Sequence, residues 1–254
     1  MRLKGKRAFL AGATSGMGVA TALEFAREGA AVLFLHYNRS AEKARELAEE
    51  VRALGSEAVP VQGNLSDPVQ TKILAGEVLQ KAGTLDVLVC FSGLTFDRDL
   101  WFRPFEEVSR EDFEAIQEAD LFTAIHLTQA FIPAFKAQKQ GRIILFGSTP
   151  AITGHDAGIP YFLAKAGVLA LTRGLAHYLG PYNIHVNAIA PGSFDTPPMG
   201  ALTTEERREL EEETALGRWG RPEEIARKVV YLASEDSEFQ TGTTMIVDGG
   251  FAIR

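Results

Sequence analysis

A glycine-rich loop between an apolar strand and a helix constrains the fold more than any other part of this sequence. Residues 8–11 are apolar, and Gly12-Ala13-Thr14-Ser15-Gly16-Met17-Gly18 leads into an amphipathic pattern that predicts a helix over 17–28. Glycines let the backbone turn tightly and approach a ligand, while a helix N-terminus offers free N–H groups and a partial positive charge. The position of the loop favours a phosphate cradle over an ordinary tight turn.

The stretch from Ser148 to Lys165 carries the groups of a proton-transfer site. Ser148 follows the apolar run 143–147, which predicts a buried strand, and ligands in open α/β sheets lie outside the carboxyl ends of strands. If a helix begins near Tyr161, then Tyr161 and Lys165 stand at i and i+4 on one face. A phenol with a pKa near ~10 ionises more easily beside a positive charge, which Lys165 supplies. The alternative is a solvated lysine beside a half-buried tyrosine.

Composition narrows the classes of function. The 254 residues include 26 lysines and arginines against 33 aspartates and glutamates, a net charge of −7, which argues against nucleic acid or an anionic membrane as a partner. The five histidines are scattered without metal-ligand spacing. The single cysteine, Cys90, lies in an apolar run and cannot form an internal disulfide, which indicates a reducing compartment. We expect one domain, a small-molecule substrate and no metal.

The basic residues at the N-terminus are not expected to form a signal peptide. The apolar segment that follows them is broken by the glycines of the loop, and its pattern continues as an amphipathic helix. No run approaches the ~20 apolar residues that span a bilayer. We therefore expect a cytoplasmic protein.

Together these features resemble the short-chain dehydrogenase/reductase family, and the resemblance covers nearly the whole chain. It rests on Ser148 thirteen positions before Tyr161, on Lys165, on the glycine spacing and on a later Pro191-Gly192 turn. Within the family the chain is similar to 3-oxoacyl-carrier-protein reductase-like and glucose dehydrogenase-like members. The resemblance implies a Rossmann-like, doubly wound parallel sheet of about seven strands, flanked by helices on both faces, in a single domain over residues 1–254.

The resemblance also implies roles for the site residues. Ser148 would hold the substrate oxygen, Tyr161 would transfer the proton, and Lys165 would lower the pKa of Tyr161 and bind the nicotinamide ribose. Asp120, where the family usually has Asn, completes the catalytic set. The residues implied to bind the cofactor are Gly12, Thr14, Ser15, Gly16, Met17, Gly18, Arg39, Ser40, Asn64, Leu65, Ser92, Gly93, Tyr161, Lys165, Pro191, Gly192, Phe194 and Thr196.

Residues 36–40 indicate which cofactor binds. A strand over 31–35 places the following residues near the adenosine ribose, where NAD-binding members usually have an Asp in place of His36. An imidazole cannot accept hydrogen bonds from both ribose hydroxyls. Arg39 is suited to a 2′-phosphate and Ser40 adds a hydroxyl, so NADP(H) is favoured, with NAD(H) as the alternative. In the competing interpretation Ser40 caps a helix over 41–54 and Arg39 is merely solvated.

Two residues depart from the family pattern in ways that bear on activity. Cys90 stands where the family commonly has Asn, so we expect packing to replace the amide hydrogen bonds. If Asp120 is ionised and close to Lys165, it stabilises the ammonium and raises the apparent pKa of the group that includes Tyr161. Alternatively, Asp120 turns into solvent, or only its backbone carbonyl matters.

The remaining patterns complete the expected α/β order. They predict strands over 58–62, 85–91, 184–189 and 245–247 and helices over 68–82, 109–138, 161–179 and from 222. Segment 195–217 is a candidate mobile lid, with a solvated helix as the alternative. The aromatic residues Trp101, Phe102 and Phe105 either border the substrate or serve as core or subunit contacts.

The resulting functional hypothesis is reversible hydride transfer between NADP(H) and a ketone or secondary alcohol, with Tyr161 exchanging the proton. An enoyl reductase of the same superfamily is disfavoured, because in such enzymes the gap between the Tyr and the Lys is wider than the four-residue spacing of Tyr161 and Lys165. Cys90 and Asp120 suggest another alternative, a dinucleotide-sensing protein that has lost catalysis. By analogy with family tetramers, the two long helices are expected to form the interface of a homotetramer or homodimer.

Overall fold

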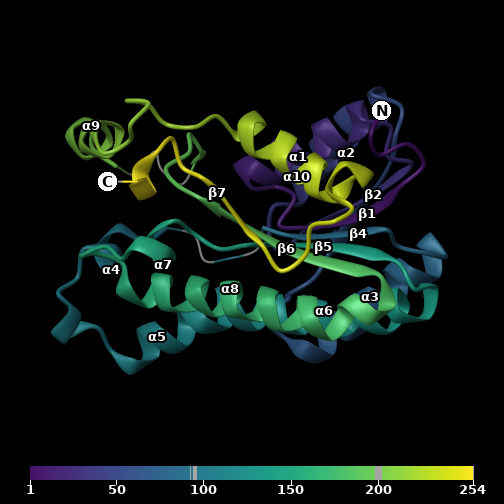
Figure 1. Cartoon of the computed structure of the whole chain (residues 1–254), viewed down its shortest axis with the longest axis horizontal. Coiled ribbons are helices and arrows are strands. Elements are labelled where there is room, and N and C mark those ends of the chain that lie inside the picture. Colours follow the sequence, from purple (N-terminus) through teal and green to yellow (C-terminus); the bar gives the residue numbers. More distant parts are fainter. Residues whose placement is uncertain (92, 94–95, 198–201, 254) are drawn as a thin grey trace.

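In the computed structural model of the chain, seven parallel strands form one sheet between two layers of helices (Figure 1). The structure describes residues 1–91, 93, 96–197 and 202–253. The strands lie in the order β3-β2-β1-β4-β5-β6-β7, which confirms the expected doubly wound sheet. They are β1 (Arg7–Ala11), β2 (Val32–Tyr37), β3 (Glu57–Gln62), β4 (Val87–Cys90), β5 (Gly141–Phe146), β6 (Ile184–Pro191) and β7 (Thr244–Val247).

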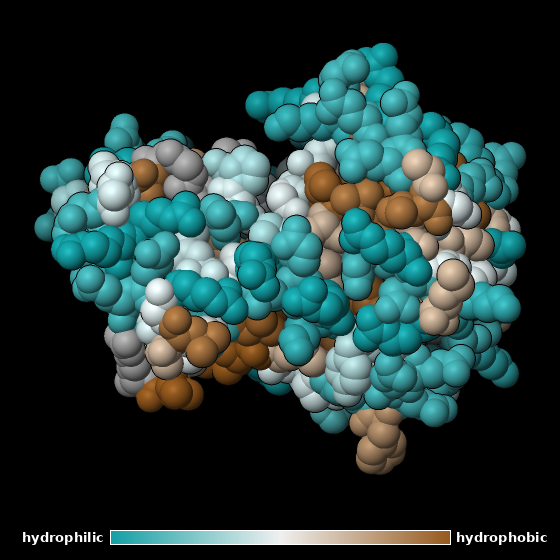
Figure 2. Space-filling model, turned by 90° about the horizontal axis from the view of Figure 1, so that it is seen from above, coloured by the Kyte–Doolittle hydropathy of each residue, from teal (hydrophilic) through white to brown (hydrophobic). Residues whose placement is uncertain are grey.

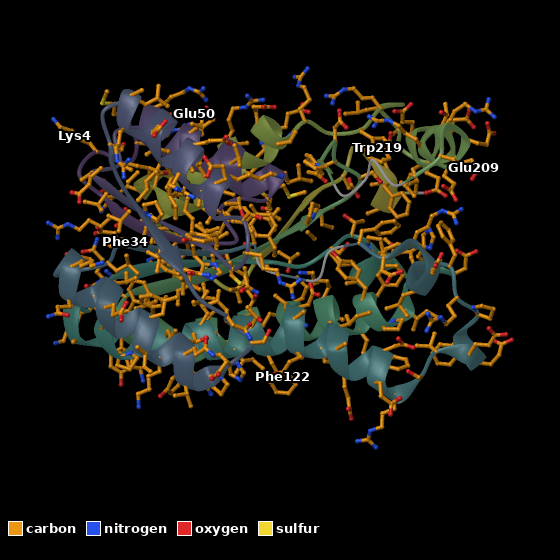
Figure 3. All side chains as sticks on the ribbon, turned by 180° about the vertical axis from the view of Figure 1, so that it is seen from behind. Lys4, Phe34, Glu50, Phe122, Glu209 and Trp219 are labelled. Atoms are coloured by element: carbon orange, nitrogen blue, oxygen red, sulfur yellow. The ribbon has the colours of Figure 1, made fainter. Side chains whose placement is uncertain are left out.

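Each face of the sheet has its own apolar core beneath its own helices. On one face lie α1 (Gly16–Arg27), α2 (Ala41–Ala53) and α10 (Pro222–Ala233), and on the other lie α3 (Pro68–Ala82), α6 (Thr123–Gln138) and α8 (Ile159–Leu179) (Figure 1). Side chains alternate between the faces along a strand. Leu33 of β2 therefore packs with Phe25 in the first core, and Phe34, labelled in Figure 3, packs with Phe131 in the second.

Shorter helices gather at the end of the molecule where the C-terminus lies (Figure 1). They include α4 (Arg98–Trp101), α7 (Pro150–Thr153) and α9 (Thr204–Glu212), and α5 (Arg110–Ile116) extends from α6 toward the same end. Short 3₁₀ turns are η1 (Phe105–Glu107), η3 (Gly180–Tyr182), η5 (Glu235–Ser237) and η6 (Phe251–Ile253). Seen from above, the surface over α9 carries mostly hydrophilic side chains (Figure 2).

Capping side chains fix where several helices begin. Ser15 accepts a hydrogen bond from the Gly18 N–H at the start of α1, and Asp67 accepts from two N–H groups at the start of α3. Ser109 and Asp112 form a capping box at the start of α5, because each side chain accepts a hydrogen bond from the other's backbone N–H group. These local signals explain why α1, α3 and α5 begin within about one residue of the predicted positions.

Two predicted elements differ from the structure. The single helix expected over 109–138 is divided, because a π-helical segment, η2 (Gln117–Phe122), separates α5 from α6. A π turn takes an extra residue, which changes the direction in which the following side chains point. The strand expected over 31–35 continues to Tyr37, so that His36 lies inside β2 rather than in the loop after it.

The sheet topology places the predicted site residues at one edge. The chain runs outward from β1 to β3 on one side of the sheet and from β4 to β7 on the other, so the order reverses between β1 and β4. Ligands in such sheets bind outside the carboxyl ends of the strands at this reversal. In the described part of the chain, no helix combines the length and the apolarity needed to cross a membrane.

Candidate active site

A cavity of about 600 Å³ opens at the carboxyl edge of the sheet. Its wall includes Gly16 of the glycine loop after β1, Ser148 after β5, Gly192 after β6, and Tyr161 and Lys165 of α8. These residues are far apart in the sequence, and the parallel topology brings them together. The described residues contain no group of three or more His, Cys, Asp or Glu side chains that would hold a metal ion.

Ser148, Tyr161 and Lys165 form a compact group in this cavity. Because α8 begins at Ile159, Tyr161 and Lys165 lie on the same face, and the Lys165 ammonium is 5.5 Å from the centre of the Tyr161 ring. The Ser148 side chain hydrogen-bonds to Tyr161 and is itself buried. Lys165 is only 5% exposed, which excludes the interpretation of a solvated lysine.

Asp120 points inward and pairs with Lys165. The distance between Asp120 Oδ1 and Lys165 Nζ is 2.7 Å, and both side chains are buried. The alternative in which Asp120 turns into solvent is therefore wrong. The carboxylate comes from η2, so the π-helical segment is the element that carries Asp120 into contact with α8.

Charges around Tyr161 act in opposite directions on its pKa. Burial raises the pKa of Tyr161, the Lys165 charge opposes this, the Asp120 charge raises the pKa further, and the hydrogen bond with Ser148 lowers it, leaving the pKa above its ordinary value. Burial lowers the pKa of Lys165, but Asp120 and Tyr161 outweigh burial and raise it. Lys165 is consequently a persistent cation at neutral pH.

The glycine loop and the turn after β6 lie close together and leave room for backbone approach. Gly12 has a φ of +76°, which favours glycine, and a Cβ at Gly18 would lie 2.5 Å from the Gly12 carbonyl oxygen. A Cβ at Gly16 would lie 3.0 Å from Thr196 Cγ2. The first N–H groups of α1 have no acceptor within the helix. A side-chain-free surface with such N–H groups fits the phosphates of a dinucleotide.

His36 connects the loops on either side of the predicted ribose site. Its Nδ1 accepts a hydrogen bond from the Gly12 N–H at 3.1 Å, and its Nε2 lies 3.0 Å from the Gly63 carbonyl oxygen. Burial lowers the pKa of His36 to about 4, so the ring is neutral at pH 7 and Nε2 carries the proton donated to Gly63. Both ring nitrogens are therefore occupied within the protein.

The residues predicted to surround the adenosine part of a dinucleotide are mostly accessible. Arg39 and Ser40 are exposed, and Ser40 makes no capping hydrogen bond to α2, contrary to the competing interpretation. Asn64 is exposed and accepts a hydrogen bond from the Ser66 N–H, whereas Leu65 is buried. No described residue forms an ion pair with Arg39.

The other predicted cofactor residues are placed as follows. The cavity wall includes Ser15, Met17, Pro191, Phe194 and Thr196, and Thr14 lies in the same glycine loop. A Cβ at Gly93 would lie 2.5 Å from Asp120 Oδ1, so Gly93 sits against the Asp120–Lys165 pair. Ser92 lies outside the described residues.

Cys90 is buried at the end of a central strand. Cys90 ends β4, pairs in register with Ala11 of β1 and Leu145 of β5, and is buried in the second core. Its surroundings agree with the prediction that this thiol acts as a small apolar side chain.

Sequence reasoning resolved the aromatic residues only in part and missed several others. Trp101 and Phe102 do line the cavity, whereas Phe105 is exposed and packs on Phe113. Glu206, Glu209 and Glu213 also line the cavity and lie in segment 195–217, the predicted lid. The missed lining residues come from separate segments: Phe91, Phe146 and His155. No local motif marks them, because only the tertiary arrangement places them at one cavity.

Comparisons with known proteins agree with this geometry. The family model described as Enoyl-(Acyl carrier protein) reductase matches residues 12–252. The chain belongs to the short-chain dehydrogenase/reductase family. It is 36% identical to a 3-oxoacyl-(acyl-carrier-protein) reductase from Thermotoga maritima over the full length of both chains. It is 33% identical to a protein with the same description from Staphylococcus aureus, covering 96% of this chain and 97% of that protein.

Solved structures give the same result for the fold. A short-chain type dehydrogenase/reductase from Mycobacterium marinum has a TM-score of 0.91 and 29% identity, over 99% of this chain and 97% of that one. A short-chain dehydrogenase/reductase from Serratia marcescens has a TM-score of 0.89 and 29% identity, over 99% of this chain and all of that one. The present short-chain dehydrogenase/reductase is thus an NAD(P)-dependent oxidoreductase with a Rossmann-like fold.

The Asp120–Lys165 pair yields a prediction about pH dependence. Asp120→Asn removes a charge that raises the pKa of Tyr161, so the pKa falls. If Tyr161 is the proton acceptor in alcohol oxidation, the rise of rate with pH moves to lower pH in the variant, by about one unit or less. The measurement is the pH–rate profile of oxidation, with folding checked by circular dichroism.

Glu118→Gln is the matched control, because Glu118 lies on the same π-helical segment but is exposed. This control is expected to leave the profile in place. An unmoved profile in Asp120→Asn would contradict the charge effect. A move to higher pH would contradict it too, since it would mean that Lys165 loses its proton when Asp120 is replaced.

Proposed function

We propose that this chain transfers a hydride reversibly between NADP(H) and a ketone or secondary alcohol. The observation that carries the proposal is the buried group of Ser148, Tyr161 and Lys165, which shares one cavity with the glycine loop. A phenol beside a fixed ammonium is suited to exchange a proton with a substrate oxygen, and the loop is suited to hold a dinucleotide. The bound nicotinamide would supply or accept the hydride.

Each residue of the group has a distinct part in this proposal. Ser148 and Tyr161 both hold the substrate oxygen, since their side chains are hydrogen-bonded to each other at the cavity wall. Tyr161 gives its proton to the oxygen in reduction and takes it back in oxidation. Lys165 keeps a positive charge beside the phenol, and Asp120 keeps Lys165 protonated and in place.

Arg39 and Ser40 favour NADP(H) over NAD(H). The two ring nitrogens of His36 are occupied by Gly12 and Gly63, so His36 offers no acceptor to the ribose hydroxyls. Exposed Arg39 follows shortly after, and a guanidinium binds a phosphate through several donors. The Ser40 hydroxyl, which makes no cap to α2, is available to the same phosphate.

The two alternative functions have weaker support. The family model carries the description of an enoyl reductase, but the four-residue spacing of Tyr161 and Lys165 is the pattern that we associate with carbonyl chemistry. A sensing protein without catalysis was suggested by Cys90 and Asp120. The packing of Cys90 in the core and the contact of Asp120 with Lys165 leave Ser148 and Tyr161 together, which supports an enzyme.

We also propose that segment 195–217 closes over the substrate. Its helix α9 lines the cavity through Glu206 and Glu209, and Glu213 lines it just after the helix ends. An ion pair between Arg98 and Glu206 connects α9 to α4. Such a contact at the surface is weak and easily broken. Motion of this segment stays a prediction.

A homotetramer or homodimer through the long helices is the assembly that we propose. Phe122 of η2 lies on the outer side of the helical layer and is 42% exposed (Figure 3). Leu163 of α8 is 57% exposed. Apolar side chains exposed on neighbouring helices fit an interface between copies of the chain.

The proton role of Tyr161 predicts a separation of binding from turnover. Tyr161→Phe keeps the ring that packs against Trp101 but removes the transferable proton, so kcat should fall by about 10²-fold or more. Cofactor affinity, titrated by fluorescence, should change little. Tyr178→Phe, at an exposed tyrosine of α8, is the control. Substantial residual turnover in Tyr161→Phe would remove the basis of the proposed proton transfer.

The cofactor preference is tested at Arg39. The wild type should bind NADPH more tightly than NADH. Arg39→Ala should weaken the binding of NADPH by about tenfold and leave the binding of NADH nearly unchanged, because only NADPH carries the 2′-phosphate. Arg45→Ala removes an exposed arginine of α2 that is paired with Glu42 and serves as the control. Equal affinities of the wild type for both cofactors would exclude this role for Arg39.

A further inference from the structure

The substrate side of the cavity carries an unusual excess of carboxylates. Among the described lining residues, five are acidic: Asp97, Asp156, Glu206, Glu209 and Glu213. The one lysine in the described lining is Lys165, whose charge is already paired with Asp120. The cavity is therefore electronegative toward any group that enters it from solvent.

Neighbouring cations offset only part of this charge, because the one arginine of the described chain that pairs with a lining carboxylate is Arg98, with Glu206. Arg98 of α4 is engaged by Glu206, and Arg207 of α9 contacts Asp195 and lies over the Trp219 ring. His155 lines the cavity beside Asp156, and its Nδ1 accepts a hydrogen bond from the Ala157 N–H. No pair of free cations suited to a phosphate is present among these described groups.

One carboxylate oxygen of the cavity indicates that the ligand carries a hydrogen-bond donor. Glu213 Oε2 is shielded from solvent and has no hydrogen-bond partner in the described structure. A shielded carboxylate oxygen without a donor is costly, so it favours a ligand that brings a hydroxyl or an ammonium group. The same oxygen would repel a phosphate or a carboxylate.

The opposite wall is aromatic and lies over the proton-transfer group. The centre of the Trp101 ring lies 5.7 Å from that of Tyr161 and 5.4 Å from those of Phe96 and Phe162, in tilted or edge-to-face contacts. Phe91 and Phe146 form a second pair at 4.6 Å. Such a wall stabilises flat or apolar substrates by burial, and its electron-rich ring faces attract cations.

We propose that the substrate is a compact aromatic or cyclic ketone, or the matching alcohol, whose other groups are neutral or cationic rather than anionic. This inference rests on the proposed function and narrows it. It separates the chain from 3-oxoacyl-(acyl-carrier-protein) reduction, which is the activity that the names of its relatives give for those proteins. Two residues determine this specificity: Glu209 of α9, labelled in Figure 3, and Glu213, which follows α9 directly.

The test compares ketones that share one ring and differ in charge. With saturating NADPH, kcat/KM is measured for methyl 4-acetylbenzoate (neutral), 4-(aminomethyl)acetophenone (cationic) and 4-acetylbenzoate (anionic). The kcat/KM of the neutral and cationic ketones should exceed that of the anionic one by about tenfold, because several carboxylates in a partly dry cavity repel a like charge. The kcat/KM for ethyl 3-oxobutanoate should likewise exceed that for 3-oxobutanoyl-coenzyme A, which carries phosphates.

Variants assign the discrimination to the two glutamates. In Glu209→Gln/Glu213→Gln the ratio of neutral to anionic kcat/KM should fall by about threefold or more. Glu212→Gln is the matched control, because Glu212 is exposed on the same helix, contacts Arg208 and does not line the cavity. Raising the salt concentration should reduce the wild-type ratio as well.

The possible outcomes distinguish the inference from the function on which it rests. If ketones are reduced but the anionic substrates are used as well as the neutral ones, the inference is overturned and the proposed function stands. A ratio that is unchanged in the double variant would overturn the role of the two glutamates. If NADPH reduces none of these ketones, the proposed function fails, and the substrate inference fails with it.

Discussion

A buried ion pair between Asp120 and Lys165 is the interaction on which the site depends. Removing one partner of a buried pair typically costs about 3–5 kcal/mol, because the remaining charge is left in a medium of low polarity. Here the pair also joins η2 to α8 and holds the ammonium beside Tyr161. Asp120, which sequence spacing alone does not connect to Tyr161 and Lys165, is thereby held at the same site.

The sheet topology supplies the other half of the site. Because the strand order reverses between β1 and β4, the loops after β1, β4, β5 and β6 meet at one edge. The glycine loop leaves its backbone accessible there, and His36 ties Gly12 to Gly63 across the end of β2. In the proposed function the glycine loop binds the phosphates, while Tyr161 of α8 transfers the proton, and both border the same cavity.

Much of the fold could be predicted from the sequence because its signals are local. Strands appear as short apolar runs, Asp67 and Ser109 cap helices, and Tyr161 and Lys165 lie one turn apart. The family resemblance then supplied the strand order and the implied roles. The sequence also marked Asp120 as a residue that bears on activity, but it could not decide whether the side chain contacts Lys165 or turns into solvent.

The remaining features depend on tertiary structure. The π-helical turn that directs Asp120 inward leaves no clear pattern in the residues 117–122. The hydrogen bonds of His36 to two loops follow from the register of β2 with β3, which the sequence does not reveal. The absence of a side-chain cap at Ser40 follows from its backbone angles, which the sequence does not reveal either. The carboxylates of the cavity come from segments separated by more than 100 residues, such as Asp97 and Glu213, so that no window of sequence contains them together.

Direct observation of hydride transfer tests the central claim. NADPH carrying deuterium at the transferable position of the nicotinamide is incubated with methyl 4-acetylbenzoate, and the product is analysed by mass spectrometry and NMR. The account predicts one deuterium on the carbinol carbon, at one face only, for each NADPH consumed. Tight binding of NADPH without transfer of the label to any ketone would contradict it and would support a dinucleotide-binding protein without this activity.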